Sequence, residues 1–251
     1  MRTIRVYLTL LALVLVYGSL VLLASLAGVT PRPNGILEGL PRRFGRAAVR
    51  AAGVRLHVNN PERIAHGESR VYVSNHVSWY DVFALASVLP RYRFVAKKEL
   101  SRIPLFGPAA AKVAAIYIDR TNRVAAFEAY RTAAEQVRGG VSVVVFPEGT
   151  RGRSYELRPF KKGPFVLAIA AQVPIVPAIV YGTRDIQPKG AIAVHSGNAE
   201  LTFLEPVPTA GLTYEDREGL MQTVWRRMAT ELERRYGIRC PAPIDTVPGS
   251  P

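Results

Sequence analysis

The stretch RVYVSNHVSWYDVFALASVL, residues 70–89, contains the pattern that decides the fold. Its first part, residues 70–74, is a short apolar run that predicts a buried strand, and residues 78–89 predict a helix. The chain must therefore turn sharply at residues 75–77. A strand that leads directly into a helix in this way is typical of a layered α/β domain.

The same alternation of strands and helices continues along the chain. Further strands are predicted at residues 54–58, 92–96, 115–119, 141–146, 175–181 and 200–204, and further helices at 122–138, 163–171 and 214–236. This order predicts an α/β fold with a mixed, largely parallel sheet flanked by helices. We expect a main domain at residues 54–239, a membrane-anchoring region at 1–53 and a disordered, proline-rich tail at 240–251.

The composition limits the kind of partner. The 251 residues include 33 Lys and Arg against 19 Asp and Glu, which gives a formal net charge of +14. Such a charge indicates a polyanionic partner, either nucleic acid, anionic lipid or a phosphorylated small molecule. The single cysteine, Cys240, excludes an internal disulfide framework and a cysteine-based zinc cluster, which fits a reducing compartment.

The amino terminus predicts attachment to a membrane. Residues 6–29 carry no charge, and a run of this length is sufficient to cross a hydrocarbon core, which takes roughly 20 residues. A cleaved signal peptide is the rival interpretation, but its apolar region is usually only about 7–15 residues long. The arginines that follow favour the cytoplasmic face of the inner membrane for the main domain, whereas Arg2 and Arg5 leave a re-entrant or monotopic insertion open.

Residues 35–52 predict an amphipathic, basic helix, with apolar residues on one side and arginines on the other. Two interpretations are open. The helix lies in the headgroup layer, where each basic residue contributes about 1 kcal/mol against anionic lipid, or it packs on the domain with its arginines in solvent.

His76 and Asp81 are the first candidates for chemistry. Five residues advance a helix by about 500°, so the two meet only if His76 lies in the turn and Asp81 in the first helical turn. An aspartate on one ring nitrogen leaves the other free to accept a proton from a hydroxyl. A contact that only stabilises the turn is the alternative. No metal site is expected, because two ligands do not fill one and His57, His66 and His195 lack supporting spacing.

The run VVVFPEGTR, residues 143–151, places polar groups at the end of another buried strand. The Arg151 guanidinium can hold a phosphate through two hydrogen bonds, assisted by loop amides near Gly149. Lys97 and Arg120 follow two further strands, so one cleft is predicted to hold an anion beside a base. The alternative is a surface ion pair between Glu148 and Arg151, worth at most about 1 kcal/mol.

Together these motifs resemble the 1-acyl-sn-glycerol-3-phosphate acyltransferase family. Four blocks of that family occur in order: N-H-x-x-x-x-D at Asn75, His76 and Asp81; a second block at Lys97, Leu100, Pro104, Gly107, Ile118, Asp119 and Arg120; F-P-E-G-T-R at residues 146–151; and V-P-I-V-P at residues 173–177. The similarity extends over about residues 55–205.

The resemblance implies an acyltransferase domain that converts lysophosphatidic acid to phosphatidic acid. His76 would take the proton from the sn-2 hydroxyl of this acceptor, and Asp81 would orient His76. The acyl donor would be a thioester of coenzyme A or of acyl carrier protein, used as a co-substrate without any cofactor or acyl-enzyme.

The resemblance also implies roles for the other motif residues. The phosphate of the acceptor would be held by Arg151, Arg120 and Lys97, with Gly149 and Thr150 of the same loop. Asn75, Glu148 and Pro177 would organise the motifs around the site.

Other functions fit parts of the same sequence. A related enzyme could use another lysolipid as acceptor, and a non-catalytic membrane protein that binds anionic lipids would explain the charge and the anchor. No nucleic-acid partner is expected, because the amino-terminal apolar run and the absence of an array of stacking aromatic residues count against nucleic-acid binding.

Overall fold

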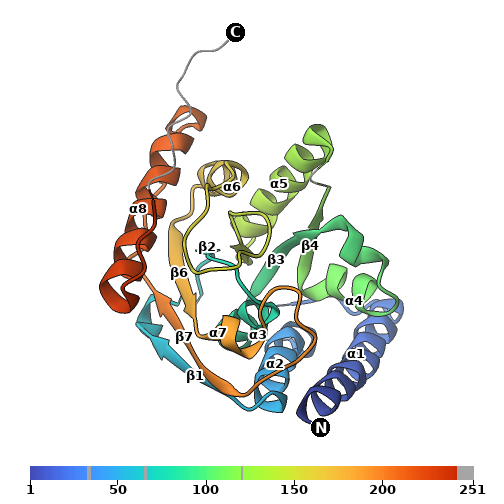
Figure 1. The fold of residues 1–251 in the computed structure, drawn as a ribbon. Helices are drawn as coiled ribbons and strands as arrows, with labels where there is room; N and C mark the ends of the chain where they lie inside the picture. Colours follow the sequence, from blue (N-terminus) through green and yellow to red (C-terminus); the bar gives the residue numbers. More distant parts are fainter. Residues whose placement is uncertain (33–34, 65–66, 120, 242–251) are drawn as a thin grey trace.

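The computed structural model describes residues 1–32, 35–64, 67–119 and 121–241, without the side chains of residues 123–127. Within this part of the chain, seven strands form one sheet (Figure 1). They are β1 (Val54–Asn59), β2 (Val71–Ser74), β3 (Tyr92–Lys97), β4 (Ala115–Ile118), β5 (Ser142–Val145), β6 (Ile175–Tyr181) and β7 (Gly197–Phe203). All seven correspond to predicted strands, although β7 begins at Gly197 rather than at Glu200.

The sheet has the order β1-β7-β6-β2-β5-β3-β4. Strands β6 and β7 are antiparallel, and every other neighbouring pair is parallel. The prediction of a mixed, largely parallel sheet is therefore confirmed. Because β2, β5 and β3 are parallel neighbours, their carboxyl ends meet at one edge of the sheet.

Eight α-helices surround this sheet in the described residues. They are α1 (Arg2–Leu26), α2 (Ile36–Ala51), α3 (Trp79–Val88), α4 (Phe106–Val113), α5 (Arg123–Arg138), α6 (Gly163–Ala171), α7 (Thr183–Ile186) and α8 (Arg217–Tyr236). Short 3-10 turns cover Pro61–Arg63, Lys98–Arg102 and Tyr214–Asp216, so the predicted helix at 214–236 starts with a separate 3-10 turn. Neither α4 nor α7 was predicted from the sequence.

Both faces of the sheet are covered, which explains why its central strands are apolar on both sides. On β2, Val71 and Val73 pack into a cluster that contains residues of α5, α6 and α8. Tyr72, between them, points to the other face and packs in a cluster with Leu85 and Leu89 at α3. Figure 1 shows the same arrangement, with α5, α6 and α8 on one side and α2 and α3 on the other.

Helix α2 packs on the domain, as in the second of the two interpretations given for residues 35–52. Leu40, Ala48 and Val49 are buried, and the Arg46 Nε atom donates to the Ser87 carbonyl of α3 at 2.9 Å. The arginine-bearing side of α2 includes the exposed Arg50. The helix therefore joins the amino-terminal region to the main domain.

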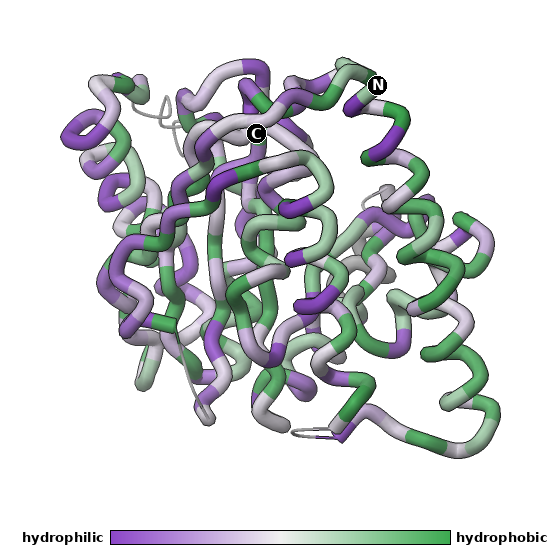
Figure 2. The backbone as a smooth tube through the Cα atoms, turned by 90° about the horizontal axis from the view of Figure 1, so that it is seen from below, coloured by the Kyte–Doolittle hydropathy of each residue, from purple (hydrophilic) through white to green (hydrophobic). Residues whose placement is uncertain are grey.

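Helix α1 is the one described helix that is long and apolar enough to cross a membrane, by length and composition. It lies beside α2 and α4, and Val21 packs there with Leu37 and Ala109 (Figure 1). The opposite side of α1 is exposed and apolar. Figure 2 shows the hydrophobic colour along most of the tube that begins at the amino terminus.

The predicted tail begins inside the packed part of the molecule. Cys240 is half-buried against the core, and its Sγ atom accepts from the Leu157 N–H at 3.3 Å. Residues 242–251 lie outside the described residues. The disorder proposed for residues 240–251 stays a prediction.

Candidate active site

His76 lies in the turn between β2 and α3. Strand β2 ends at Ser74, and α3 begins at Trp79 with Ser78 as its amino-terminal cap. The His76 Nδ1 atom lies 2.8 Å from the Asp81 Oδ2 atom. Because a carboxylate only accepts hydrogen bonds, Nδ1 carries the proton in this pair and Nε2 is left to accept one.

Four hydrogen bonds fix the Asp81 carboxylate. Its Oδ2 atom accepts from the backbone N–H groups of Val77 at 2.6 Å and Ser78 at 2.8 Å, in addition to His76, and its Oδ1 atom accepts from the Thr183 hydroxyl at 2.5 Å. The Asp81 side chain is fully buried, whereas the His76 side chain is 14% exposed. The carboxylate is therefore immobile while the imidazole can be reached from outside.

Asn75 joins the His76 turn to strand β6. Its side-chain nitrogen donates to the Val180 carbonyl at 2.9 Å, and its side-chain oxygen accepts from the Val180 N–H at 2.8 Å. Pro177 of the same strand is buried and lies in parallel register with Val73, and its carbonyl accepts from the Leu204 N–H. Both placements fit residues that organise the site.

The F-P-E-G-T-R loop and Gly152, which follows it, hydrogen-bond to the backbone of His76. The His76 N–H donates to Glu148 Oε1 at 3.1 Å, and the His76 carbonyl accepts from the Gly152 N–H at 2.7 Å. The imidazole stacks on the Phe146 ring with 3.9 Å between the ring centroids. The first and third sequence motifs therefore meet at this histidine.

The buried Glu148 carboxylate forms an ion pair with Arg158, whose side chain is 40% exposed, and this pair was not predicted from the sequence. The Arg158 Nε atom lies 2.9 Å from Glu148 Oε2, and the same guanidinium donates to the Thr150 hydroxyl and carbonyl. Burial raises the pKa of the Glu148 carboxyl, and the contacts with Arg158 and the His76 N–H offset part of that rise. The alternative of a surface pair between Glu148 and Arg151 is thus wrong.

Arg158 lies outside the four motif blocks, directly before Pro159-Phe160-Lys161, so no motif marked it as a partner of Glu148. Its three bonds to Glu148 and Thr150 close the loop, in which the Gly149 N–H donates to the Phe146 carbonyl at 3.1 Å. The Thr150 side chain therefore binds Arg158, and its assignment to the substrate phosphate stays a prediction.

Arg151 lies beside the His76 turn. Its guanidinium carbon is 5.1 Å from the centre of the Trp79 ring, at the start of α3, and Trp79 is 39% exposed. A guanidinium on an aromatic face keeps its edges available for an anion. Lys189 also approaches this loop, because its Nζ atom donates to the Arg151 carbonyl at 2.8 Å.

Of the remaining predicted cations, the structure places Lys97 at the same edge of the sheet. Lys97 ends β3 with an exposed side chain, which makes no hydrogen bond or ion pair with the described residues. Lys98 forms an ion pair with Asp119 at 3.2 Å. The pKa of the Asp119 carboxyl is lowered to about 2, mainly by its hydrogen bonds from Thr121 and to a smaller extent by the contact with Lys98. Arg120 lies outside the described residues, so its placement stays a prediction.

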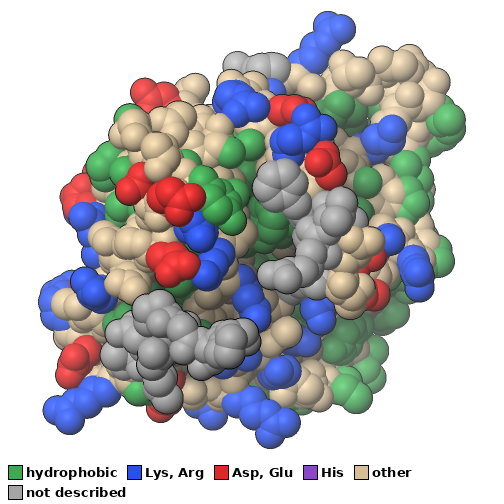
Figure 3. Space-filling view, turned by 90° about the horizontal axis from the view of Figure 1, so that it is seen from above, with side chains coloured by type: hydrophobic (Ala, Val, Ile, Leu, Met, Phe, Trp, Pro, Cys, Tyr) green, Lys and Arg blue, Asp and Glu red, His purple; other side chains and the backbone are tan. Residues whose placement is uncertain are grey.

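The arrangement provides a base next to a cation and suits proton removal from a hydroxyl on an anionic molecule. No group of three or more His, Cys, Asp or Glu residues that could hold a metal ion occurs in the described part of the chain. Figure 3 shows Lys and Arg side chains spread over one face of the molecule, which favours the approach of anions.

Comparison with known proteins gives the family. The model of the family described as Acyltransferase matches residues 55–181, which include all four sequence motifs. The chain belongs to the acyltransferase family. The resemblance found in the motifs is confirmed at this level, and His76 and Asp81 lie within the matched region of this acyltransferase.

Two human proteins illustrate the similarity. The chain is 36% identical over 180 residues to 1-acyl-sn-glycerol-3-phosphate acyltransferase beta, across 71% of this acyltransferase and 65% of the human protein. It is 36% identical over 188 residues to the alpha protein, across 71% of this chain and 66% of that one. The chain thus spans slightly less than two thirds of the length of these relatives.

The fold agrees with that of a solved structure. The crystal structure of the 1-acyl-sn-glycerophosphate (LPA) acyltransferase PlsC from Thermotoga maritima matches this acyltransferase with a TM-score of 0.72 and 28% identity. The match covers 94% of this chain and 99% of the other, so it includes the amino-terminal helices as well as the sheet.

Proposed function

We propose that this acyltransferase moves an acyl chain from a thioester donor to the sn-2 hydroxyl of lysophosphatidic acid and releases phosphatidic acid. The observation that carries the proposal is the pair of His76 with the buried Asp81, next to an arginine that rests on Trp79. The names of the human relatives and of the Thermotoga maritima protein support this acceptor.

In the proposed reaction, His76 Nε2 takes the proton from the sn-2 hydroxyl while the oxygen attacks the thioester carbonyl. A new C–O ester bond forms, the C–S bond breaks, and the leaving thiolate receives the proton from the imidazolium. Asp81 keeps the imidazole in the correct tautomer and stabilises its positive charge, without accepting the proton itself.

The acceptor phosphate would lie on Arg151, because this guanidinium is held beside the turn that contains His76. Fixing the phosphate places the hydroxyl near the base, which is the proximity contribution to catalysis. Lys97 and Arg120 are proposed as further contacts, together with Gly149 and Thr150. The donor would be acyl-coenzyme A or an acylated carrier protein, and no cofactor is needed for this chemistry.

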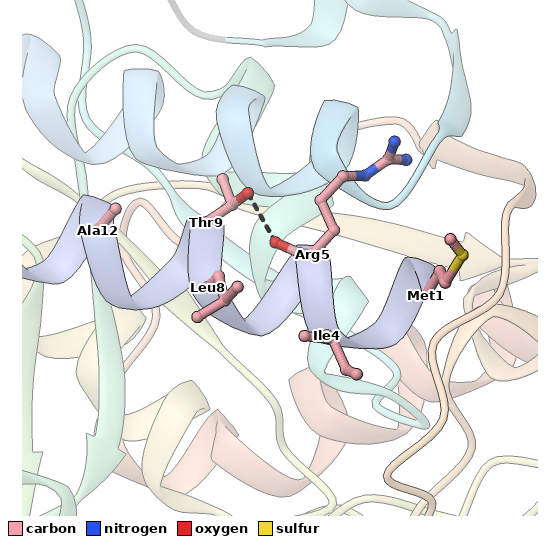
Figure 4. A pocket seen from close by; sticks show the side chains of 6 residues that line it. All are labelled: Met1, Ile4, Arg5, Leu8, Thr9 and Ala12. Carbon is pink, nitrogen blue, oxygen red and sulfur yellow. Dashed lines mark hydrogen bonds between the residues drawn. The ribbon is translucent and has the colours of Figure 1, made fainter.

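The proposed location is the cytoplasmic face of the inner membrane. The outer side of α1 presents an apolar stripe that includes Ile4, Leu8, Leu11 and Leu15, which are 53–65% exposed. Figure 4 shows Ile4 and Leu8 on the same side of this helix. The inner side of α1 is fixed to the domain, so we infer that the helix lies in the membrane surface with its stripe in the lipid and its basic neighbours near anionic headgroups.

An acyl-transfer assay with a variant at the base tests the proposal. The detergent-solubilised protein would be supplied with labelled acyl-coenzyme A or acylated carrier protein and with lysophosphatidic acid. His76→Ala should lower kcat by about 10²–10⁴-fold, the usual contribution of a general base. The matched control is His57→Ala, because His57 is exposed on β1 and should not affect turnover.

The acceptor is tested in the same assay with a panel of lysolipids. If the protein prefers an acceptor with a different headgroup, that lipid replaces lysophosphatidic acid as the proposed acceptor, and the proposed mechanism still holds. Undiminished turnover by His76→Ala would refute the mechanism. Failure of the wild type with every donor and acceptor would favour a lipid-binding protein without catalysis.

A further inference from the structure

The short helix α7 lies directly behind the catalytic pair, outside the four sequence motifs. It follows strand β6 after Gly182 and begins at Thr183, which is fully buried. The Thr183 hydroxyl donates to Asp81 Oδ1 at 2.5 Å. Thr183 thus binds Oδ1, the carboxylate oxygen that does not contact His76.

The two oxygens of Asp81 have different tasks. Oδ2 receives His76 Nδ1 and the backbone N–H groups of Val77 and Ser78, so it is shared among three donors. The donor on Oδ1 determines the rotation of the carboxylate plane and thereby the direction in which Oδ2 meets the imidazole. A hydroxyl on a β-branched side chain suits this task, because threonine has few rotamers.

The backbone around Thr183 is fixed on both sides. Gly182 has a φ of +82°, and a Cβ atom there would lie 2.2 Å from the Asn198 carbonyl oxygen, so the entry into α7 requires glycine. At the other end of α7, the Gln187 carbonyl accepts from the Ser78 hydroxyl at 2.7 Å. Helix α7 therefore contacts the His76–Asp81 turn at two points, through Thr183 and through Gln187.

A buried tyrosine completes this support. The Tyr155 hydroxyl accepts from the Arg184 N–H at 3.0 Å, next to Thr183. A phenol is neutral at physiological pH, and burial raises the pKa of Tyr155 further, to about 12, so Tyr155 adds no charge beside Asp81. The negative charge of the catalytic carboxylate is therefore not opposed by a neighbouring phenolate.

We propose that Thr183 is a positioning residue of the acyl-transfer reaction, which sets the orientation of Asp81 and through it that of His76. The inference rests on the function proposed above. It adds a residue that touches no substrate and that lies beyond the last motif. Its effect should therefore appear in the rate of proton transfer and leave substrate binding unchanged.

Three variants test this role through kinetics. Thr183→Val keeps the shape of the side chain and removes the hydroxyl. It should lower kcat by about 10- to 100-fold and leave the KM of both substrates unchanged, because a small misplacement of a catalytic group has effects of this size. Thr183→Ser keeps the hydroxyl and should recover most of kcat. Thr183→Ala gives the same comparison should the valine variant fail to fold.

Thr209→Val is the matched control for the loss of a buried hydroxyl. Thr209 is 1% exposed and donates to the Val173 carbonyl at 2.8 Å, with no contact to the catalytic pair among the described residues. Its variant should keep the wild-type kcat. Thermal denaturation of all variants establishes that the comparison is made on folded protein.

The His76 Nδ1 proton gives a second readout that needs no turnover. Its low-field NMR resonance should shift or broaden in Thr183→Val and should be unchanged in Thr183→Ser and Thr209→Val. An unaltered resonance together with wild-type kcat in folded Thr183→Val would overturn the inference. A rise in KM without a change in kcat in Thr183→Val would also overturn it, as would a kcat of Thr183→Ser as low as that of Thr183→Val. An inactive wild type would refute the proposed function instead, and the resonance would still decide the role of Thr183.

Discussion

His76 is held through its backbone and its ring by four contacts with other residues. Its N–H, carbonyl, ring nitrogen and ring face contact Glu148, Gly152, Asp81 and Phe146 respectively. The relation between His76 and Asp81 was predictable, because their spacing excludes a shared helical face and requires a turn. The other contacts come from segments distant in the sequence, and no local pattern indicates which distant group will face a given backbone amide.

At the same scale, Arg151 is expected to bind the acceptor phosphate. Arg151→Ala should raise the KM for lysophosphatidic acid by about 10- to 100-fold, because a hydrogen bond to a charged group contributes about 1.5–3 kcal/mol. The KM for the thioester donor should stay near the wild-type value in a steady-state assay. Arg153→Ala is the control, since Arg153 is an exposed arginine of the same loop. An equal KM for the acceptor in both variants would contradict the phosphate role.

Among the elements, the strands and the long helices were predicted, whereas two short helices, α4 and α7, were not. Helix α6 and strand β6 have the predicted bounds, because each is a continuous apolar run that packs in the core. Helix α4 was missed because Pro104, Gly107 and Pro108 interrupt the local pattern. Helix α7, with four residues, depends on contacts with the His76 turn rather than on its own sequence.

Gly107 of α4 is one of the positions where a side chain cannot be accommodated. It lies in the first turn of α4, and a Cβ atom there would be 2.1 Å from the Ser101 carbonyl oxygen. Gly107→Ala should therefore displace the 3-10 turn at Lys98–Arg102 and lower the free energy of unfolding by about 1–3 kcal/mol, measured as a lower Tm by circular dichroism.

The control for this substitution is Gly219→Ala in α8. A Cβ atom at Gly219 would meet nothing within 4 Å. Alanine is favoured over glycine in a helix by up to about 1 kcal/mol, so this variant should keep or slightly raise the Tm. A Tm for Gly107→Ala as high as that of the control would show that the turn adapts without cost.

For the whole molecule, the sheet places the carboxyl ends of β2, β5 and β3 at one edge, where the His76 turn, the F-P-E-G-T-R loop and Lys97 follow them. Alternating strands and helices predicted this edge, since the carboxyl ends of parallel strands lie on the same side of a sheet. The apolar run at the amino terminus was equally clear from the sequence. Which side of α1 would face outward was not predictable, because the pattern is apolar all round and only the contacts with the domain select the buried side.

The exposed stripe of α1 should therefore determine membrane binding. Leu11 is 56% exposed within this stripe, and an aspartate in the hydrocarbon region costs about 2.5–3.5 kcal/mol. Leu11→Asp should lower binding to sedimented vesicles by at least about tenfold, while Thr230→Asp, which adds the same charge on an exposed position of α8, should bind like the wild type. Because Leu11 points away from the domain, both variants should keep the wild-type Tm. Equal binding by Leu11→Asp and the wild type would show that another surface holds the protein on the membrane.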